Sequence, residues 1–553
     1  MPVIRLHKDR FEELVPGIKR EELEELLFRL KCEVEEVDQD YVEIEVNPDR
    51  VDMYIGEGIS RALKGLLGIE KGIPEYRVND TGFTTVVENV VSRPYIGVAI
   101  VYDVNIDERY LEELIQFQEK IHQTYGRKRK KIAIGLHDLE KVPSKKLAYK
   151  LVDIDSTSFV PLGYDKKMPV REILSKTPQG REYGQISIYK NRYHPAILSG
   201  DDIISLPPVI NAELTRIEPG TKNVLIDVTG IRKSDVVKIL DVLVTNLSER
   251  GGRLLGRVEI TEYNGRQYYT PILGSEILRL SVSYTNKILG TSLDSRGIAE
   301  LLEKMRYTAQ VIDTEWVETI VPPYRVDILH TIDLIEDVAI AIGYEELGVA
   351  KPRLMLRGKT DELNDFTNIV AEMLVGYGFQ EIYSFILDSL NRQSLFVNTD
   401  SVVTIENPVT IDLNSLRATL LSPLVEFMEK NQHAKMPIKV FEIGPVAYIV
   451  DNNVVEETRL GIGIMDNSIS YEDIQAIVYG LMRILGLQPS AKPGRTRGFL
   501  EGRIGVLVVD DTEVGIMGEV HPEILEKMGI KYPIALAELS IDKLFRLYME
   551  KAR

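Results

Sequence analysis

Residues 322–345 read PPYRVDILHTIDLIEDVAIAIGYE, and four acidic side chains fall between Asp327 and Asp337. Asp333, Glu336 and Asp337 are three and four positions apart, so a helix here would place their carboxylates on one face. The apolar residues between them would face a core. Oxygen donors of this kind suit a hard cation such as Mg2+. The alternative is an ordinary solvated acidic face.

This stretch has a counterpart near the start of the chain. Residues 48–52 read PDRVD and residues 323–327 read PYRVD, a shift of 275 positions (323 minus 48). At the same shift, the ELL at 25–27 lies on the ELL at 300–302. We infer that one helix–strand–turn–helix module is used twice.

The two copies differ at the acidic positions. In the first copy, the positions of the three helix acids hold residues without negative charge: Gly58, Arg61 and Ala62. Asp327 does keep a counterpart, Asp52, so this carboxylate could equally be a turn or capping group shared by both copies. Because only one copy has the helix acids, we predict that they serve function rather than folding.

Composition is that of an ordinary globular protein. The 553 residues suffice for roughly three or four domains, each with its own core. A net charge of −18 argues against a protein whose whole surface binds nucleic acid. The single cysteine, Cys32, excludes an internal disulfide and a zinc site built from thiolates. No apolar run approaches the ~20 residues of a membrane span, and the first residues lack a signal-peptide core, so we expect a cytoplasmic protein with no membrane partner.

We predict an α+β multidomain chain in four parts. Residues 1–85 and 271–350 would hold the two module copies. Residues 86–270 combine strand patterns with helices, which is typical of an α/β domain. In residues 355–553, strands separated by turns and joined by amphipathic helices indicate an antiparallel sheet with helices on one face.

Two features of the second part could carry chemistry. The basic run RKRKK at 127–131 is either a solvated face or a place to meet phosphates. Further on, SLPPVIN and IDVTG place Ser205, Asn211, Asp227 and Thr229 where strands end or bend, so these polar side chains can line a cleft. The alternative is that they satisfy loop backbones.

Several long segments together resemble the beta subunits of phenylalanyl-tRNA synthetases of the archaeal and eukaryotic type. They include NPDRVDMYIGEGISRALKGLLG (47–68), GRKRKKIAIGLHDL (126–139), VPPYRVDILHTIDLIEDVAIAIGYEEL (321–347) and LRATLLSPLVEFMEKN (416–431). The resemblance covers essentially the whole chain. It implies an (αβ)2 heterotetramer in which the alpha subunit charges tRNA(Phe) with phenylalanine, using ATP, and the beta subunit hydrolyses mischarged Tyr-tRNA(Phe). It also implies that Asp327, Asp333, Glu336 and Asp337 bind Mg2+ at the border with the alpha subunit.

For editing, the resemblance implies a site that contains Leu198, Ser205, Asp227 and Thr229. A buried polar group such as Asp227 or Thr229 would recognise the tyrosine hydroxyl that phenylalanine lacks. We expect no metal and no cysteine or histidine nucleophile there, so side chains and the terminal hydroxyl of the tRNA would position the attacking water. Ala212 departs from the family pattern, because many relatives carry a small hydroxyl residue at that position.

The last part, residues 355–553, resembles a class II synthetase catalytic fold without its catalytic motifs. Glu442 lacks an arginine two residues before it, and ALAELSID (535–542) has neither the glycines nor the final arginine that hold ATP. We predict a catalytically empty domain used for dimerisation and alpha-subunit packing. The competing hypotheses are an architectural or tRNA-docking subunit with an inactive editing cleft, and a self-sufficient Mg2+-dependent enzyme, which the missing arginines disfavour.

Overall fold

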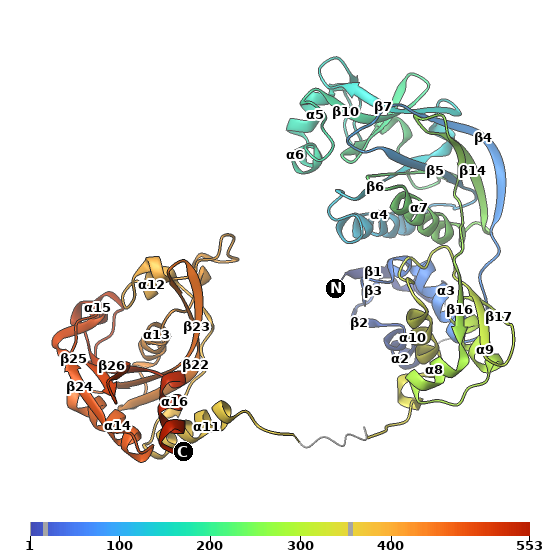
Figure 1. Ribbon diagram of the computed structural model, residues 1–553. Helices are drawn as coiled ribbons and strands as arrows, with labels where there is room; N and C mark the ends of the chain where they lie inside the picture. Colours follow the sequence, from blue (N-terminus) through green and yellow to red (C-terminus); the bar gives the residue numbers. More distant parts are fainter. Residues whose placement is uncertain (1, 15–19, 352–357, 553) are drawn as a thin grey trace. The chain divides into compact units, whose positions relative to one another are not determined.

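The computed structural model describes residues 2–14, 20–351 and 358–552. It divides into two compact units, Met1–Lys351 and Pro352–Arg553 (Figure 1). The start predicted for the last domain, residue 355, lies outside the described residues. Among the helices that the structure describes, none has the length and apolar character that crossing a membrane requires.

Apart from one short 3-10 helix, two small modules of the first unit are built from the same elements in the same order. The first consists of β1 (Val3–His7), α1 (Lys8–Leu14), α2 (Arg20–Arg29), β2 (Cys32–Val37), β3 (Tyr41–Val46), the short 3-10 helix η1 (Val51–Met53) and α3 (Gly56–Leu66). The second consists of β16 (Ile277–Ser281), α8 (Val282–Leu289), α9 (Ser295–Lys304), β17 (Thr308–Val311), β18 (Trp316–Ile320) and α10 (Thr331–Ile342). Helix α9 has the bounds of α2 moved by 275 positions (295 minus 20), and the strand orders β1-β3-β2 and β16-β18-β17 are equivalent. The repeat inferred from two short motifs therefore extends over the strands and helices of both described modules.

Local sequence explains where the last helix of the second module begins and ends. His330 and Asp333 form a capping box at the N-terminus of α10, which satisfies backbone N–H groups that have no partner within the helix. Gly343 follows the helix with φ of 99°, a conformation that side chains with a Cβ rarely adopt. Helix α10 therefore contains all three predicted helix acids and presents them at a fixed register.

The two modules pack against each other through equivalent surfaces. Arg29, at the end of α2, donates hydrogen bonds to the carbonyls of Ile340 and Ala341 in α10, both at 3.1 Å. On the other side, the end of α9 lies so close to α3 that a Cβ on Gly65 would come within 2.3 Å of the Lys304 carbonyl. Each module thus offers the end of its second helix to the last helix of the other, as in a two-fold symmetric dimer.

The described residues between the modules form a ten-stranded sheet. Its strands are β4 (Arg77–Val87), β5 (Tyr95–Val101), β6 (Ile132–Asp138), β7 (Lys146–Asp153), β10 (Tyr193–Ser199), β11 (Asp202–Leu206), β12 (Ile210–Asn211), β13 (Val224–Gly230), β14 (Leu254–Thr261) and β15 (Gln267–Thr270). Their order is β12-β11-β10-β7-β4-β14-β5-β13-β6, with β15 beside β14. Strand β4 lies in this sheet, so the predicted limit at residue 85 falls inside a strand and is corrected to a position before Arg77.

Helices α4 (Glu108–Gln123) and α7 (Lys233–Ser248) lie between this sheet and the modules (Figure 1). One hydrophobic core contains Val228 of β13, Leu243 of α7, Ile59 of α3 and Ile335 of α10. Two short helices, α5 (Val170–Lys176) and α6 (Pro178–Tyr183), belong to the part of the domain near β10 and β11. Because both modules share the core of α4 and α7, the modules and the sheet are held together by buried apolar surface.

The second unit is built around a seven-stranded sheet, counted over its described residues. Its elements are α11 (Glu362–Gly376), β19 (Gln380–Glu381), β20 (Leu387–Asp388), α12 (Leu390–Gln393), β21 (Ser415–Leu416), α13 (Leu421–Asn431), β22 (Ile438–Val450), β23 (Asn453–Met465), α14 (Tyr471–Ile484), β24 (Pro489–Pro493), β25 (Phe499–Val509), β26 (Thr512–Val520), α15 (Pro522–Lys527), β27 (Ile534–Ser540) and α16 (Ile541–Ala552). The order is β19-β22-β23-β27-β26-β25-β24, antiparallel except for β19 beside β22.

Helices cover both faces of this sheet. Val440 and Phe441 are adjacent on β22 and both are buried, but they belong to different cores. Phe441 packs with Phe366 of α11 and Val478 of α14, whereas Val440 packs with Leu424 of α13. The prediction of helices on one face is therefore wrong, because both sides of the strands carry apolar residues.

Candidate functional site

A cavity of about 590 Å³ lies in the first unit between α4, α6 and strands of the large sheet. Most of the exposed area of its wall is apolar, and eleven polar residues also line it: Gln118, Glu119, Arg129, Gln179, Glu182, Tyr183, Ser205, Asn211, Thr215, Arg216 and Asp227. Cavities of this size and character bind small molecules or single side chains.

Asp227 of β13 is the centre of a buried polar chain at this cavity. Its Oδ2 lies 2.8 Å from Nε2 of His137, and Nδ1 of His137 lies 2.7 Å from the hydroxyl oxygen of Thr215. A carboxylate can only accept, so Nε2 of His137 donates to it, and in a neutral imidazole Nδ1 then accepts the hydroxyl proton of Thr215. The chain therefore fixes the tautomer of His137 and the orientation of one carboxylate oxygen.

The other oxygen of Asp227 has no such partner. Oδ1 is buried and accepts no hydrogen bond from the residues that the structure describes. Leaving a buried acceptor unpaired costs roughly 1–3 kcal/mol. Gly135 makes room for the carboxylate, because a Cβ there would lie 1.9 Å from Oδ2. A residue of the cavity wall thus carries a fixed carboxylate with one oxygen that has no hydrogen-bond partner among the described residues.

A second set of hydrogen bonds lies in another part of the cavity wall. The hydroxyl of Ser205 donates to Oδ1 of Asn211 at 2.9 Å. Arg129 donates to the carbonyls of Pro208 and Val209 at 3.1 and 3.0 Å. These bonds tie the loop after β11 to the basic run and keep the wall in one conformation.

Two of the four residues predicted for editing lie at this cavity, and two do not. Ser205 and Asp227 line it. Leu198 packs in the apolar core near α5. Thr229 is buried with its hydroxyl oxygen accepting from Nε of Arg93 at 2.9 Å. Side chains two apart on a strand share a face, so what separates Thr229 from the cavity is its position along β13.

His137 and Thr215 were not predicted; His137 lies at this site as a hydrogen-bond partner of Asp227, and the expectation that no histidine acts as a nucleophile there stays a prediction. Strands β6 and β13 are neighbours, with Asp227 opposite Gly135. His137 is two residues further along β6 and therefore on the same face. The alternation in KIAIGLHDL indicates which residues share that face, but not that β13 is the neighbouring strand.

The basic run beside the cavity is partly exposed. Arg127, Lys128 and Lys130 are exposed, whereas Arg129 reaches the cavity wall. Arg127, Lys128 and Arg129 have φ of 50°, 54° and 63°. Left-handed backbone at residues with a Cβ costs roughly 1–2 kcal/mol each, and such strain gathers at functional sites. The loop holds three exposed cations next to the cavity.

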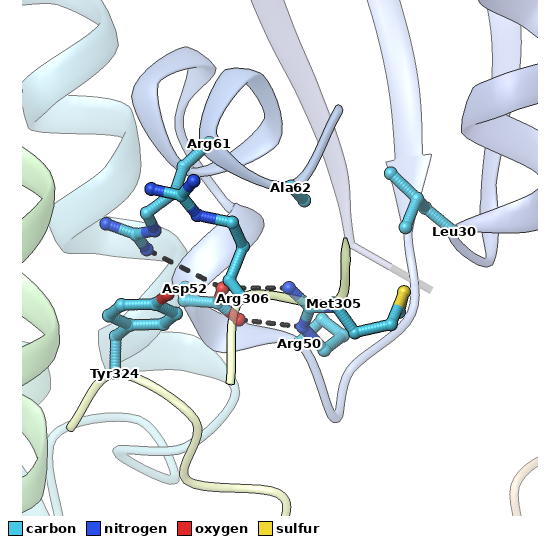
Figure 2. A pocket seen from close by; sticks show the side chains of 8 residues that line it. All are labelled: Leu30, Arg50, Asp52, Arg61, Ala62, Met305, Arg306 and Tyr324. Atoms are coloured by element: carbon cyan, nitrogen blue, oxygen red, sulfur yellow. Dashed lines mark hydrogen bonds and ion pairs between the residues drawn. The ribbon is translucent and has the colours of Figure 1, made fainter. Parts of the chain in front are cut away.

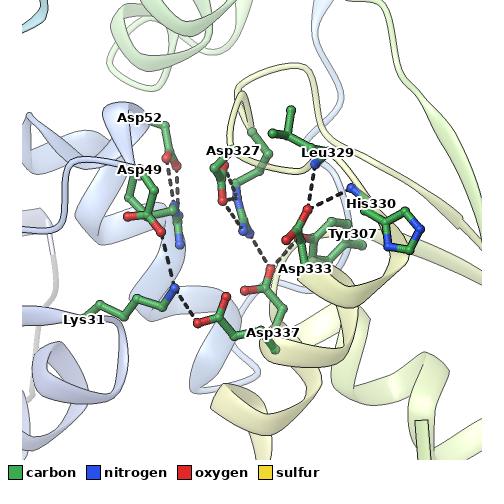
Figure 3. A network of polar contacts seen from close by, with 12 residues as sticks. Lys31, Asp49, Asp52, Tyr307, Asp327, Leu329, His330, Asp333 and Asp337 are labelled. Atoms are coloured by element: carbon green, nitrogen blue, oxygen red, sulfur yellow. Dashed lines mark hydrogen bonds and ion pairs between the residues drawn. The ribbon is translucent and has the colours of Figure 1, made fainter. Parts of the chain in front are cut away.

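The acidic stretch of the second module is held by protein partners (Figure 3). Asp327 accepts two hydrogen bonds from Arg325, at 2.9 and 2.7 Å. Asp337 accepts from the remaining nitrogen of the same guanidinium at 2.6 Å and from the hydroxyl of Tyr307. Burial works to raise the pKa of Asp327, but the charge of Arg325 outweighs it and the pKa is lowered.

The other two acids have different partners. Asp333 accepts from the backbone N–H groups of Leu329 and His330, both at 2.8 Å. Glu336 pairs across the module contact with Nζ of Lys31 at 2.7 Å. Asp333 and Asp337 therefore take part in folding, which corrects the prediction that the helix acids serve function alone.

These partners bear on the predicted Mg2+ site. In the part of the chain that the structure describes, no three His, Cys, Asp or Glu side chains are grouped so that they could hold a metal. Mg2+ requires oxygens at about 2.1 Å in nearly octahedral geometry. The four carboxylates in this arrangement do not fit it, and binding would require Arg325 to release Asp327 and Asp337, and Lys31 to release Glu336. The ligand set stays a prediction.

Comparisons with known proteins agree with the architecture. The family model of the tRNA synthetase B5 domain matches residues 278–344, and that of the phenylalanyl tRNA synthetase beta chain CLM domain matches residues 349–541. A phenylalanine–tRNA ligase beta subunit from Aeropyrum pernix is 44% identical over 547 residues, with 99% of both chains covered. The chain belongs to the phenylalanine–tRNA ligase beta subunits.

Further relatives support this. A phenylalanine–tRNA ligase beta subunit from Sulfurisphaera tokodaii is 43% identical over 550 residues, covering 98% of this chain and 99% of the relative. The crystal structure of an N-terminal fragment of the phenylalanyl-tRNA synthetase beta subunit from Pyrococcus horikoshii is 36% identical, with a TM-score of 0.59. It covers 62% of this chain and 100% of the fragment.

In this beta subunit, the glutamate of the last domain is enclosed. Glu442 accepts a hydrogen bond from the hydroxyl of Ser384 at 2.6 Å and pairs with Arg417. Both charged side chains are fully buried. Position 440 is not an arginine. Instead, Arg417, which follows β21, pairs with Glu442 and balances its charge inside the fold.

Proposed function

We propose that this beta subunit joins an alpha subunit in an (αβ)2 heterotetramer that charges tRNA(Phe) with phenylalanine, using ATP, in the cytoplasm. Within it, the cavity at Asp227 hydrolyses mischarged Tyr-tRNA(Phe). The names of the relatives, which are beta subunits of this ligase over nearly their full length, support the first statement. Phenylalanyl-tRNA synthetases are generally Mg2+-dependent. No step proposed for this chain depends on the ion.

The unpaired Oδ1 of Asp227 is the observation that supports editing. The para-hydroxyl of a tyrosyl group entering the cavity would donate a hydrogen bond to this oxygen. A phenylalanyl group has no donor there and would leave the carboxylate oxygen buried and unpaired. A hydrogen bond to a charged group is worth about 1.5–3 kcal/mol, which corresponds to about 10- to 150-fold discrimination.

Neighbouring groups support the same assignment. His137 and Thr215 hold the carboxylate in place, so the acceptor needs no reorganisation when the tyrosyl group binds. Arg127, Lys128 and Lys130 offer positive charge on the loop that reaches the cavity, where a tRNA backbone can be bound. The ester is then held at the mouth while the side chain fills the cavity.

The test uses the complex with its alpha subunit. Asp227→Ala is expected to lower deacylation of Tyr-tRNA(Phe) about 10- to 150-fold while phenylalanine charging continues, which also reports that the complex is intact. Thr229→Ser is the control, because this side chain lies away from the cavity and the variant keeps the hydroxyl that accepts from Arg93. An unchanged deacylation rate in Asp227→Ala would remove the site.

The second candidate is an architectural or tRNA-docking subunit with an inactive cleft. Ala212 favours it, because this residue lies at the cavity and has no hydroxyl to hold a water or the substrate. In that case the wild-type complex charges tRNA(Phe) but deacylates Tyr-tRNA(Phe) no faster than buffer does. Comparing wild-type deacylation with the uncatalysed rate separates the two candidates.

A further inference from the structure

The contact between the two modules carries different charges on its two sides. On one side, Nζ of Lys31 lies 2.7 Å from Glu336 and 3.3 Å from Asp49, so one cation faces two anions. The equivalent positions on the other side, shifted by 275, hold two cations and a neutral side chain: Arg306, Arg61 and Tyr324. Where the first side has an ion pair, the second brings two guanidinium groups together.

These three side chains line one small cavity (Figure 2). Arg61, Arg306 and Tyr324 are only 3%, 3% and 2% exposed. Nη1 and Nη2 of Arg61, Nε and Nη1 of Arg306, and the hydroxyl of Tyr324 lack hydrogen-bond partners among the described residues. The ion pairs of Arg61 with Asp52 and Glu249, at 3.6 and 3.5 Å, are longer than hydrogen bonds. Buried donors of this kind are costly unless something accepts from them.

The ion pairs at the cavity contain more arginines than carboxylates. A continuous set of ion pairs joins four arginines to three carboxylates: Arg50, Arg61, Arg253 and Arg306 with Asp52, Glu70 and Glu249. This set carries one positive charge in excess (four minus three). Arginine stays protonated in proteins, so the excess cannot be removed by losing a proton. This excess is local, because Asp327 of the neighbouring Arg325–Asp327–Asp337 set, which carries one negative charge, also acts on Arg50, and because Arg253 and Glu70 are 28% and 38% exposed. What favours an anion at the cavity is the set of unpaired N–H donors on the buried Arg61 and Arg306.

The size of the cavity limits what the counter-ion can be. About 10 Å³ is open to the centre of a water-sized sphere, which is room for a single such body. Carboxylates, phosphates and nucleotides are too large. We propose that a single monatomic anion, chloride in solution, binds between Arg61 and Arg306 and accepts a hydrogen bond from the hydroxyl of Tyr324.

On its side of the module contact, this anion supplies the negative charge that Glu336 supplies to Lys31 on the other side. It satisfies donors from both modules, so it links α3 of the first to the end of α9 in the second. Without the anion, the positively charged guanidinium groups of Arg61 and Arg306 would face each other while shielded from solvent. The anion is therefore a structural ligand of the beta subunit, and its binding is independent of the editing cavity.

Bromide is the direct probe. Crystals of the full chain grown in sodium bromide are expected to show an anomalous peak between the guanidinium groups of Arg61 and Arg306. In solution, chloride at about 100-fold over its Kd should raise the Tm by on the order of 5 °C relative to sodium gluconate at equal ionic strength. A water without bromide signal, together with equal Tm values in chloride and gluconate, would overturn the proposal.

Variants locate the effect. Arg306→Gln and Arg61→Gln each remove the excess charge and are expected to abolish the difference between chloride and gluconate. Lys31→Gln is the matched control, because Lys31 is the counterpart of Arg306 on the balanced side, and it should keep the full response. If Lys31→Gln loses the response as completely as Arg306→Gln does, the anion is not held where we place it. Should a variant not fold, the bromide peak and the wild-type halide titration decide the question alone.

Discussion

The two modules share a fold and differ in how they hold the aspartate of their common turn. In the first module, Arg50 donates to both oxygens of Asp52, each at 2.9 Å. In the second, Arg325 donates to Asp327 in the same way and uses its remaining nitrogen for Asp337. The arginine–aspartate pair therefore belongs to the fold, and the second acid is an addition.

The addition comes with matching changes nearby. In the second module, the hydroxyl of Tyr307 donates a hydrogen bond to Asp337. The first module has Cys32 and Ala62 at these positions. The second module thus has both the aspartate and the tyrosine, and the first module has neither. A residue that one copy lacks can therefore still be tied into the fold of the other copy by hydrogen bonds.

The largest effect is expected from removing the arginine of the shared turn. Arg325→Ala leaves Asp327 and Asp337 buried without a cation, which should lower the free energy of unfolding by about 3–5 kcal/mol. Arg50→Ala should cost less, because Arg61 remains 3.6 Å from Asp52. Urea unfolding of the full chain measures both. Equal losses would mean that the second acid adds nothing to the role of Arg325.

Converting the added pair to the first module's pattern is the next test. Asp337→Ala leaves the buried hydroxyl of Tyr307 without an acceptor and should cost about 1–3 kcal/mol in unfolding free energy. Adding Tyr307→Phe removes the stranded hydroxyl and should restore most of the loss. A double-mutant cycle by urea unfolding checks this. Strictly additive losses would show that the two side chains do not act as a pair.

The capping role of Asp333 predicts a smaller loss. Asp333→Ala removes the acceptor for two backbone N–H groups and should cost about 1 kcal/mol. Amide hydrogen exchange should quicken at Leu329 and His330, whose N–H groups donate to this carboxylate. The equivalent position in the first module is Gly58, so its α3 begins without such a cap. Exchange that stays at the wild-type rate would contradict the capping role.

The ion pair across the contact should contribute least among these substitutions. Lys31 and Glu336 have side chains that are 26% and 45% exposed, so Glu336→Gln should cost at most about 1 kcal/mol. The loss should shrink as salt is raised, because solvent screens exposed charges. Thermal unfolding at low and high ionic strength measures it. A loss that persists unchanged at high salt would show that the pair is shielded from solvent.

Finally, the modules should show no difference in when they unfold. Cys32 lies in the first module and Trp316 in the second, and each is the only residue of its type. Burial raises the pKa of Cys32 to about 12, so thiol labelling should begin only when the first module opens. Because one core joins both modules, labelling and tryptophan fluorescence should give the same urea midpoint. Separate midpoints would show that the modules are independent.

Some of this architecture could be predicted from the sequence. The shift of 275 positions identified both modules, and the spacing of Asp333, Glu336 and Asp337 correctly placed all three on one helix. Their partners could not be predicted, because Lys31 approaches Glu336 only through the packing of one module on the other. Spacing along a helix fixes which residues share a face, but not what that face meets.

The candidate site shows the same limit. Ser205 and Asp227 were predicted because turn residues that follow them indicate strand ends; Ser205 does lie next to the end of β11, whereas Asp227 lies in the middle of β13. His137 was missed because it lies ninety positions before Asp227, and the order of strands in a mixed sheet is not readable from their patterns. Thr215 was missed because it lies in a short 3-10 helix and is linked to Asp227 through His137. Thr229 was misplaced for a related reason, since its neighbour Arg93 comes from a distant loop.

The first and second modules are separated by the whole ten-stranded sheet, and this spacing has a consequence during synthesis. Ribosomes add about 5–20 residues per second, so roughly 15–55 s pass between the emergence of equivalent positions in the two modules. During that time, α10 is not yet present to accept the hydrogen bonds of Arg29, and the end of α9 is not yet present to pack against Gly65. Only when α10 leaves the exit tunnel can the pair close, so translation arrested before that point should yield a chain that chaperones retain.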